Sequence, residues 1–145
     1  MRIGHLIRSQ DLLTLDESAS VLEAARAMTA RSVGAILVTT ADGRLAGIFT
    51  ERDLMSRVVV PEREPDKIRL REVMTREVYS VGPDREVGDV RTELSQRHFR
   101  HLPVVVDGRV VGILSLRDLL RADIDEMSHE VEELEKYFLG GPEVA

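Results

Sequence analysis

The chain has 145 residues, of which 43% are hydrophobic and 32% are charged, and its formal net charge is −6. This composition suits one ordinary domain or two tightly joined small halves, and it argues against intrinsic disorder. Cysteine is absent, which excludes a disulfide framework, a thiolate zinc site and a cysteine nucleophile. We expect a cytoplasmic protein that does not enter a membrane, because the sequence has neither a signal-peptide core nor an apolar run of roughly 20 residues.

The negative charge is concentrated at the C-terminal end. Residues 123–145 hold eight acids and one base, whereas the other 122 residues hold 19 bases and 18 acids. The body of the protein is therefore nearly neutral and shows no basic stripe that would follow a nucleic-acid backbone. Aromatic residues make up only 3% of the chain, so platforms for stacking bases are scarce. We expect no nucleic-acid partner.

The sequence contains an internal repeat. Residues 21–38 align with 87–104 at an offset of 66, and residues 42–54 align with 107–119 at an offset of 65. Eight of the 13 positions in the second block are identical, and one residue is lost near Ala41. Each unit alone is too small to bury its apolar face well, which predicts two units related by a pseudo-two-fold axis.

Each unit predicts the order β-α-β-β-α, so the expected fold class is α+β. In the first unit, residues 1–60, we expect strands at 12–15, 36–38 and 45–49. Apolar residues at helical spacing predict a helix from Val21, with Ser20 and Glu23 as a capping box. The dipeptide Asp42-Gly43 predicts a hairpin, and a second helix is expected to open at Thr50.

After a linker at 61–70, the second unit, residues 71–122, repeats this order. Strands are expected at 78–81, 104–106 and 110–114, and helices are expected from Val87 and from Ser115. The cap of the helix at Val87 is less clear, and Asp107-Gly108 predicts the second hairpin.

A separate acidic, amphipathic helix is expected over 123–139, followed by a tail at 140–145. Six apolar residues recur there and just before it at alternating intervals of four and three, which is a heptad a/d pattern: Leu120, Ile124, Met127, Val131, Leu134 and Phe138. We call this set the seam. It predicts a helix that packs either on its own body or against another subunit, and the sequence leaves both alternatives open.

One motif occurs at equivalent places in both units, as Gly47-Ile-Phe-Thr-Glu-Arg-Asp53 and as Gly112-Ile-Leu-Ser-Leu-Arg-Asp118. A hydroxyl followed three residues later by an acid is typical of a helix cap. The free N–H groups of a helix N-terminus also attract anions, and an arginine stands beside the acid in both copies. A hydroxyl can donate to phosphate, and a carboxylate suits the vicinal hydroxyls of a ribose. The motif therefore predicts nucleotide binding, capping, or both.

Motifs for catalysis are missing from the sequence. We find no Gly-x-Ser-x-Gly elbow, no Walker loop and no His-Glu-x-x-His. His98 and His101 are three residues apart, but they are expected at a helix-to-strand junction, where a phosphate contact or a structural role is favoured over a metal site. We assign no catalytic residue and expect a protein that is not an enzyme.

The tandem arrangement of this motif over residues 1–122 resembles a pair of CBS domains, named for cystathionine β-synthase, of the stand-alone bacterial type. The run His101-Leu-Pro-Val104 followed by Asp107-Gly-Arg-Val-Val-Gly112 resembles the core signature of that family. Val73-Met-Thr75 resembles the segment before the first strand of a repeat. The resemblance implies a non-catalytic regulatory module with two clefts that bind AMP, ADP, ATP or a related adenosyl compound.

The resemblance also assigns roles to individual residues. Phosphate would meet Thr50 and Ser115, with Arg52 and Arg117 neutralising it, and the ribose hydroxyls would meet Asp53 and Asp118. Adenine would lie near Leu12, Ala35 and Ile36 in one cleft and near Val78, His101, Leu102 and Pro103 in the other. The two clefts need not share a ligand or an affinity, because the second unit has Leu102-Pro103 where the first has Ile36-Leu37, and Leu116 where the first has Glu51. The second unit matches the family more closely. We therefore favour its site.

The resemblance further implies a homodimer and an unidentified effector protein, and the seam is consistent with the homodimer. An alternative is a protein interaction module with degenerate clefts that acts through the C-terminal helix. A small enzyme with residues distributed along the chain is a weaker third hypothesis.

Overall fold

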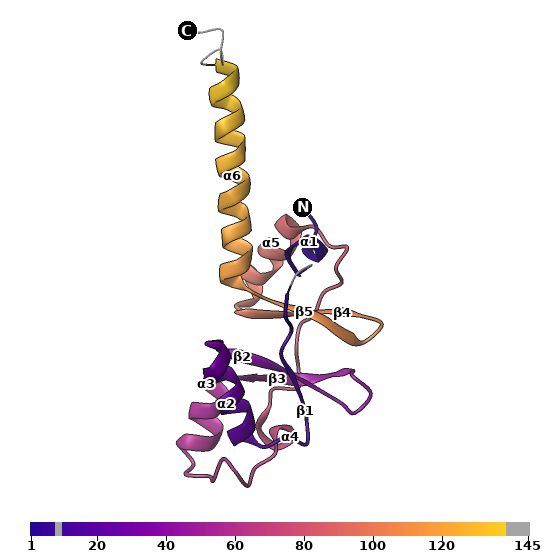
Figure 1. Cartoon of the computed structure of the whole chain (residues 1–145), viewed down its shortest axis with the longest axis vertical. Coiled ribbons are helices and arrows are strands. Elements are labelled where there is room, and N and C mark those ends of the chain that lie inside the picture. The colour runs from indigo at the N-terminus through magenta and orange to yellow at the C-terminus, as the bar shows by residue number, and fades with distance from the viewer. Residues whose placement is uncertain (8–9, 139–145) are drawn as a thin grey trace.

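The computed structural model describes residues 1–7 and 10–138. Two α+β halves lie one above the other, and a long helix projects from the upper half (Figure 1). The predicted fold class is confirmed. The expected tail at 140–145 and the last residue of the expected C-terminal helix, Leu139, lie outside the described residues.

The first repeat is a three-stranded sheet covered by helices on one side. Its elements are β1 (Thr14–Asp16), α2 (Val21–Arg31), β2 (Ala35–Thr39), β3 (Leu45–Thr50), α3 (Glu51–Leu54) and a π-helical turn at Met55–Val59. β2 lies in the centre, parallel to β1 and antiparallel to β3. Ile36 and Val38 face the helices, whereas Ala35 and Leu37 belong to a separate core between the two sheets.

The second repeat contains α5 (Val87–Arg97), β4 (His101–Val106), β5 (Arg109–Ser115) and α6 (Leu116–Phe138). The strand expected at 78–81 is reduced to a single parallel bridge between Val81 and Val104. Val81 donates to the carbonyl of Pro103, and Val105 donates to the carbonyl of Val81. The next bond of a longer ladder would need an N–H from Pro103, which proline lacks. The proline in β4 therefore shortens the pairing.

The helix caps differ between the repeats as the sequence predicts. The Ser20 side chain accepts a hydrogen bond of 3.1 Å from the backbone N–H of Glu23 at the start of α2. Glu86, in the equivalent position before α5, makes no side-chain cap bond. Both helices end on a residue with left-handed backbone, Ser32 at φ 54° and His98 at φ 60°, so the α–β connections have the same course.

The two hairpins explain why the alignment loses one residue near Ala41. The second hairpin has a two-residue turn with positive φ at both Asp107 (51°) and Gly108 (80°), the geometry that an Asp-Gly pair favours. In the first hairpin Gly43 donates to the carbonyl of Thr40 at 3.0 Å and only the glycine has a positive φ, of 82°. This is a three-residue loop that closes with glycine in the left-handed region.

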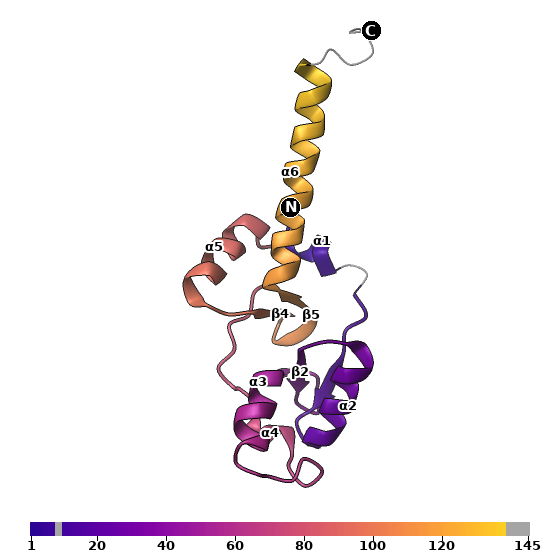
Figure 2. The same ribbon diagram turned by 90° about the vertical axis from the view of Figure 1, so that its left-hand side faces the viewer.

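The opening segment of each repeat packs on the other repeat. α1 (Ile3–Ile7) lies beside the base of α6 and β5 in the second repeat, where Ile3 is fully buried (Figure 2). α4 (Leu70–Val73) packs in the core of the first repeat, and Thr75 then exchanges two backbone hydrogen bonds of 2.9 Å with Ile48 of β3. The units 1–60 and 71–122 expected from the sequence are therefore interleaved in space.

The boundary expected at residue 123 is wrong, because α6 runs without a break from Leu116 to Phe138. No glycine or proline interrupts this stretch. Leu119 and Ala122 anchor the base of α6 in the core of the second repeat. The seam residues are 47% to 74% exposed, so the alternative in which the seam packs on its own body is excluded for this chain.

Candidate functional site

Two cavities lie between the repeats, and each combines elements of both. Cavity A has a volume of about 1210 Å³ and contains the Ser115 motif at the start of α6, together with the connection from α2 to β2. Cavity B has a volume of about 560 Å³ and contains the Thr50 motif at the start of α3, together with the connection from α5 to β4. Both volumes fall near the range of roughly 300–1,000 Å³ that is usual for small-molecule sites.

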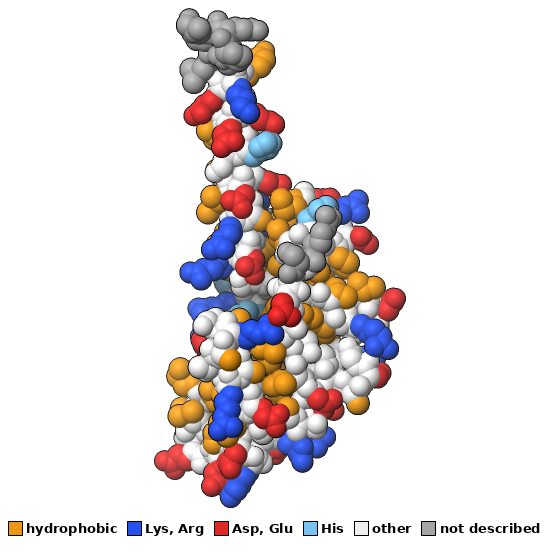
Figure 3. Space-filling view, viewed as in Figure 1, with side chains coloured by type: hydrophobic (Ala, Val, Ile, Leu, Met, Phe, Trp, Pro, Cys, Tyr) orange, Lys and Arg blue, Asp and Glu red, His pale blue; other side chains and the backbone are white. Residues whose placement is uncertain are grey.

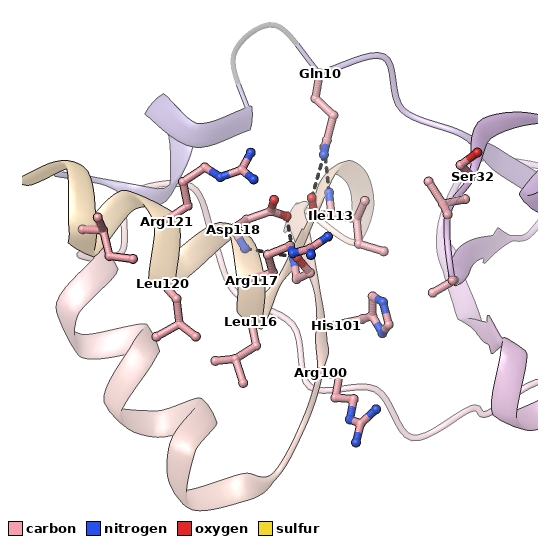
Figure 4. A pocket seen from close by; sticks show the side chains of 15 residues that line it. Gln10, Ser32, Arg100, His101, Ile113, Leu116, Arg117, Asp118, Leu120 and Arg121 are labelled. Carbon is pink, nitrogen blue, oxygen red and sulfur yellow. Dashed lines mark hydrogen bonds between the residues drawn. The ribbon is translucent and has the colours of Figure 1, made fainter.

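In cavity A the motif caps α6 and keeps its carboxylate accessible. The Ser115 N–H donates to Asp118 Oδ2 at 2.8 Å, and the Asp118 N–H donates to Ser115 Oγ at 3.1 Å. Asp118 is exposed, and its Oδ1 accepts no hydrogen bond among the described residues. Figure 4 shows Asp118 at the cavity wall. One carboxylate oxygen and the Ser115 hydroxyl proton are therefore available to a ligand.

Cavity A is rich in arginine. Arg100, Arg117 and Arg121 line it, and Asp118 is the one carboxylate among its lining residues. Figure 4 shows Arg117 and Arg121 on α6 and Arg100 at the end of the connection before β4. Blue side chains gather at the base of α6 in Figure 3, next to the notch between the two halves. The cavity thus has the charge that an anion requires, at the N-terminus of a long helix.

His101 lies between the two cavities and lines both. Its burial lowers the pKa of the imidazole below the usual 6.5, and the positive charge of Arg100 lowers it further. The carboxylates of Asp118 and Glu51, one from each motif region, act in the opposite direction on this pKa. His101 therefore lies within reach of charged groups from both motif regions.

In cavity B the motif aspartate is engaged by its own chain. Asp53 Oδ2 accepts the Thr50 N–H at 3.0 Å, and the Asp53 N–H donates to Thr50 Oγ1 at 3.2 Å. The Thr75 hydroxyl also donates to Asp53 Oδ1 at 3.2 Å, and Arg57 Nε lies 3.8 Å from the same oxygen. Asp53 is only 6% exposed. The Asp53 carboxylate therefore accepts hydrogen bonds from the protein itself and has a structural role here.

Asp53 is buried and Asp118 is exposed because different residues bond to the strand that leads into each motif. Thr75 pairs with β3 through its backbone, which brings its hydroxyl to Asp53. At the equivalent place on β5, Gln10 bonds through its side chain instead, donating to the carbonyl of Ile113 at 2.7 Å and accepting its N–H at 2.9 Å (Figure 4). Cavity B also holds three carboxylates against two arginines, which makes it less suited to an anion.

The structure places the residues that the sequence singled out in a crosswise pattern. Cavity A brings Ser115, Arg117 and Asp118 of the second repeat together with Ala35 of the first. Cavity B brings Thr50, Arg52 and Asp53 together with Val78. His101 belongs to both. Four of the residues expected around adenine line neither cavity: Leu12, Ile36, Leu102 and Pro103. Ile36 and Leu102 are almost fully buried in the cores under the helices.

Sequence reasoning missed Gln10, Arg100 and Arg121 in cavity A. Arg121 stands one helical turn after Arg117, and that spacing could have indicated it. Nothing local in the sequence indicates Gln10, because its bond to Ile113 spans 103 residues.

Two further classes of site can be addressed over the described residues. No group of three histidine or acidic side chains with the geometry of a metal site occurs in residues 1–7 and 10–138. Within the same part of the chain, we find no helix with the length and apolar character of a membrane span.

Comparison with known proteins identifies the repeat. The family model described as "CBS domain" matches residues 3–60 and 70–125. The protein CBSCBSPB2 of Arabidopsis thaliana, described as CBS domain-containing, is 34% identical over 127 residues, which cover 88% of this chain and 24% of the relative. The chain thus spans about a quarter of that relative's length.

Solved structures share the fold of the chain. The CBS-domain containing protein ATU1752 of Agrobacterium tumefaciens is 31% identical and superposes with a TM-score of 0.75, covering 85% of this chain and 99% of that one. The CBS domain pair of protein MJ0100, solved with 5′-methylthioadenosine and S-adenosyl-L-methionine, is 26% identical with a TM-score of 0.75 and covers 87% and 98%. Since the family model covers both repeats, the chain belongs to the CBS domain family as a tandem pair, a regulatory module.

Proposed function

We propose that the chain is a non-catalytic regulatory module that binds an adenine nucleotide, AMP, ADP or ATP, or a related adenosyl compound, in cavity A. One observation carries the proposal: an exposed Asp118 carboxylate and a helix-capping Ser115 hydroxyl stand together at the wall of the larger cavity. In this proposal the module acts in the cytoplasm and passes its signal to an unidentified effector protein.

The chemistry of the cavity wall suggests how such a ligand lies. The phosphate would meet the N-terminus of α6, the Ser115 hydroxyl and the guanidinium of Arg117. The ribose hydroxyls would donate to the Asp118 carboxylate. The purine would then extend toward the first repeat, where Val33 and Ala35 offer apolar surface. The complex of MJ0100 with two adenosyl compounds supports this ligand class.

Regulation would work through linkage between binding and conformation. Cavity A is walled by the first repeat, by β5 and by the base of α6, so a bound ligand contacts all three. A ligand shifts a conformational equilibrium only by its differential affinity for the two states. The arrangement that brings the α2–β2 connection closest to α6 would be favoured by the ligand, and α6 would carry the change outward.

We propose cavity B as the weaker site. The Asp53 carboxylate would have to exchange the Thr75 hydroxyl for a ribose hydroxyl, which gains little net hydrogen bonding. This proposal keeps the preference for the motif of the second repeat inferred from the sequence, although Leu102 and Pro103 line neither cavity.

Isothermal titration calorimetry with AMP, ADP, ATP, S-adenosylmethionine and 5′-methylthioadenosine, at one salt concentration, tests the proposal. At least one of them should bind with a micromolar or lower Kd. Asp118→Ala should weaken that ligand by about 2 kcal/mol or more, roughly 30-fold, because two hydrogen bonds to a charged acceptor are lost. Asp125→Ala is the matched control, since Asp125 is exposed on the same helix and does not line the cavity.

If none of the five compounds binds, the nucleotide proposal is refuted. The alternative of a protein interaction module that acts through α6 would then be favoured, because the six apolar side chains of its seam are exposed. A ligand that binds equally well to wild type and Asp118→Ala would instead remove cavity A as the site.

A further inference from the structure

The projecting part of α6 has an apolar stripe that no residue of the described part of the chain covers. Ile124, Met127, Val131 and Leu134 are 52% to 62% exposed, and Phe138 is 74% exposed. In Figure 3 hydrophobic side chains stand along the projecting helix between acidic ones. A helix that extends into solvent while exposing such a stripe is expected to bury it against a partner.

We infer that the partner is a second copy of this chain and that the two α6 helices pair antiparallel along the seam. In the heptad, Ile124, Val131 and Phe138 occupy a positions, and Leu120, Met127 and Leu134 occupy d positions. An antiparallel register that places Ile124 opposite Leu134 also places Met127 opposite Val131 and Leu120 opposite Phe138. All six layers of the pair are then apolar.

The seam approaches the area of a standard interface. Its six side chains together expose on the order of 700 Å² per copy, which is the upper limit of what they can bury, against about 800 Å² per partner in a standard specific interface. The stretch from Leu120 to Phe138 is also long enough for five helical turns at 3.6 residues per turn. Both numbers fit a symmetric pair of helices.

Charge selects the antiparallel orientation. In an antiparallel pair, e positions face e positions and g positions face g positions. Arg121 and Glu135 are e residues, so Arg121 lies next to Glu135 of the second copy, and this contact occurs twice. Glu130 is a g residue. Glu130 faces its own copy once. In a parallel pair Glu130 would instead face Glu135 of the second copy twice, and Arg121 would lose its acidic neighbour. The antiparallel pairing also aligns the helix dipoles favourably.

This charge pattern arises because basic and acidic residues are unevenly distributed along α6. Arginines occur only near its base, at Arg117 and Arg121, whereas seven acids and one lysine occupy residues 123–138. Pairing base to tip therefore neutralises charge, and pairing tip to tip accumulates it. The pairing involves only the seam and its flanking charges and does not depend on nucleotide binding.

Light scattering coupled to size-exclusion chromatography of the full chain, without nucleotide, is the first test. We expect a dimer of the 16.3 kDa chain. Leu134→Asn places two unpaired amides in the dimer core and should raise the dimer Kd by roughly 100-fold or more. His129→Asn introduces the same residue on the outer face of the helix and should leave the dimer intact. Leu134 is 54% exposed in the single chain, so its replacement does not remove a contact of the fold.

Two further variants test the orientation. Arg121→Glu should weaken the dimer, and the combination of Arg121→Glu with Glu135→Arg should restore it. Because the chain contains no cysteine, single cysteines report proximity without background. Ser128→Cys should be joined by a short thiol cross-linker, since position 128 faces its own copy across the antiparallel pair. Leu134→Cys should not, because the two copies are ten residues apart along the axis, about 15 Å.

Three results would overturn the inference. A monomeric wild-type chain would show that a different occupant covers the seam. A dimer that survives Leu134→Asn unchanged would place the interface elsewhere, for example at the exposed Met55 and Val59 of the first repeat. Cross-linking through Leu134→Cys but not through Ser128→Cys would show a parallel pair. None of these readouts uses a nucleotide, so their failure is distinct from failure of the proposed function.

Discussion

The two motif aspartates should differ in what their removal does to the stability of the fold. Asp53→Ala deletes a buried carboxylate that completes a helix cap, accepts the Thr75 hydroxyl and lies beside Arg57. A lost cap costs about 1 kcal/mol, and a hydrogen bond to a charged group costs about 1.5–3 kcal/mol. Arg57 is 46% exposed, so its ion pair adds little. We expect a total loss of about 3 kcal/mol.

Asp118→Ala should cost only about 1 kcal/mol, because the exposed Asp118 has the cap as its only hydrogen-bonding role among the described residues. For a chain of this size, 1 kcal/mol corresponds to roughly 3 °C in Tm. Thermal and urea unfolding followed by circular dichroism should therefore give a loss of about 9 °C for Asp53→Ala and about 3 °C for Asp118→Ala.

Thr75→Val separates the cap from the threonine contact. It should lower stability on its own, and combined with Asp53→Ala it should cost less than the sum of the two single changes, because both remove the same hydrogen bond. Equal losses for the two aspartates, or strict additivity of Asp53→Ala and Thr75→Val, would refute the assignment of Asp53 as a structural acceptor.

Three other changes test the packing and electrostatics of the pair. Gly47→Ala should cost about 2 kcal/mol in urea unfolding, because its new methyl group would lie 2.6 Å from the backbone oxygen of Thr75; an unchanged midpoint would contradict this close approach. Gly88→Ala should add roughly 0.5–1 kcal/mol in the same assay, since its methyl group would meet nothing within 4 Å in α5, and a loss would show that the helix start is strained. The pKa of His101 is lowered in the fold, so below about pH 6.5 the unfolded chain binds a proton that the folded chain resists. Stability should therefore fall as the pH drops from 7 to 5.5, and less so in His101→Gln; identical pH profiles would show that His101 is not the group responsible.

Much of the fold follows from local sequence. The apolar spacing from Val21 and the cap at Ser20 predict α2, and the Asp-Gly pairs predict both hairpins. These features depend on residues within a few positions of each other, so the chain specifies them without long-range contacts. The repeat itself predicts that the second half has the same course.

One departure from the sequence predictions arises where distant residues decide. The first strand of the second repeat is lost because Pro103 cannot donate to it. The loss of this strand cannot be read from the periodicity of residues 78–81 alone. The continuity of α6 past residue 123 is a different case, because no glycine or proline interrupts residues 116–138 and the seam already begins at Leu120.

The sequence predicts the motif residues of the candidate site, but it does not predict which residues of the opposite repeat line each cavity. The Ser115 and Thr50 motifs were recognisable from their repetition, but each cavity is completed by the α–β connection of the opposite repeat. The accessible state of Asp118 and the buried state of Asp53 depend on Gln10 and Thr75. Gln10 lies 103 residues before its partner Ile113, and Thr75 lies 22 residues after Asp53. Only the packing of the repeats brings these groups together.

A crystal structure of the chain soaked or grown with AMP is the most direct test of the account. We predict the nucleotide in cavity A, with its ribose hydroxyls on Asp118 and its phosphate at the Ser115 hydroxyl and the first turn of α6. Nucleotide bound in cavity B alone, or outside both cavities, would contradict it.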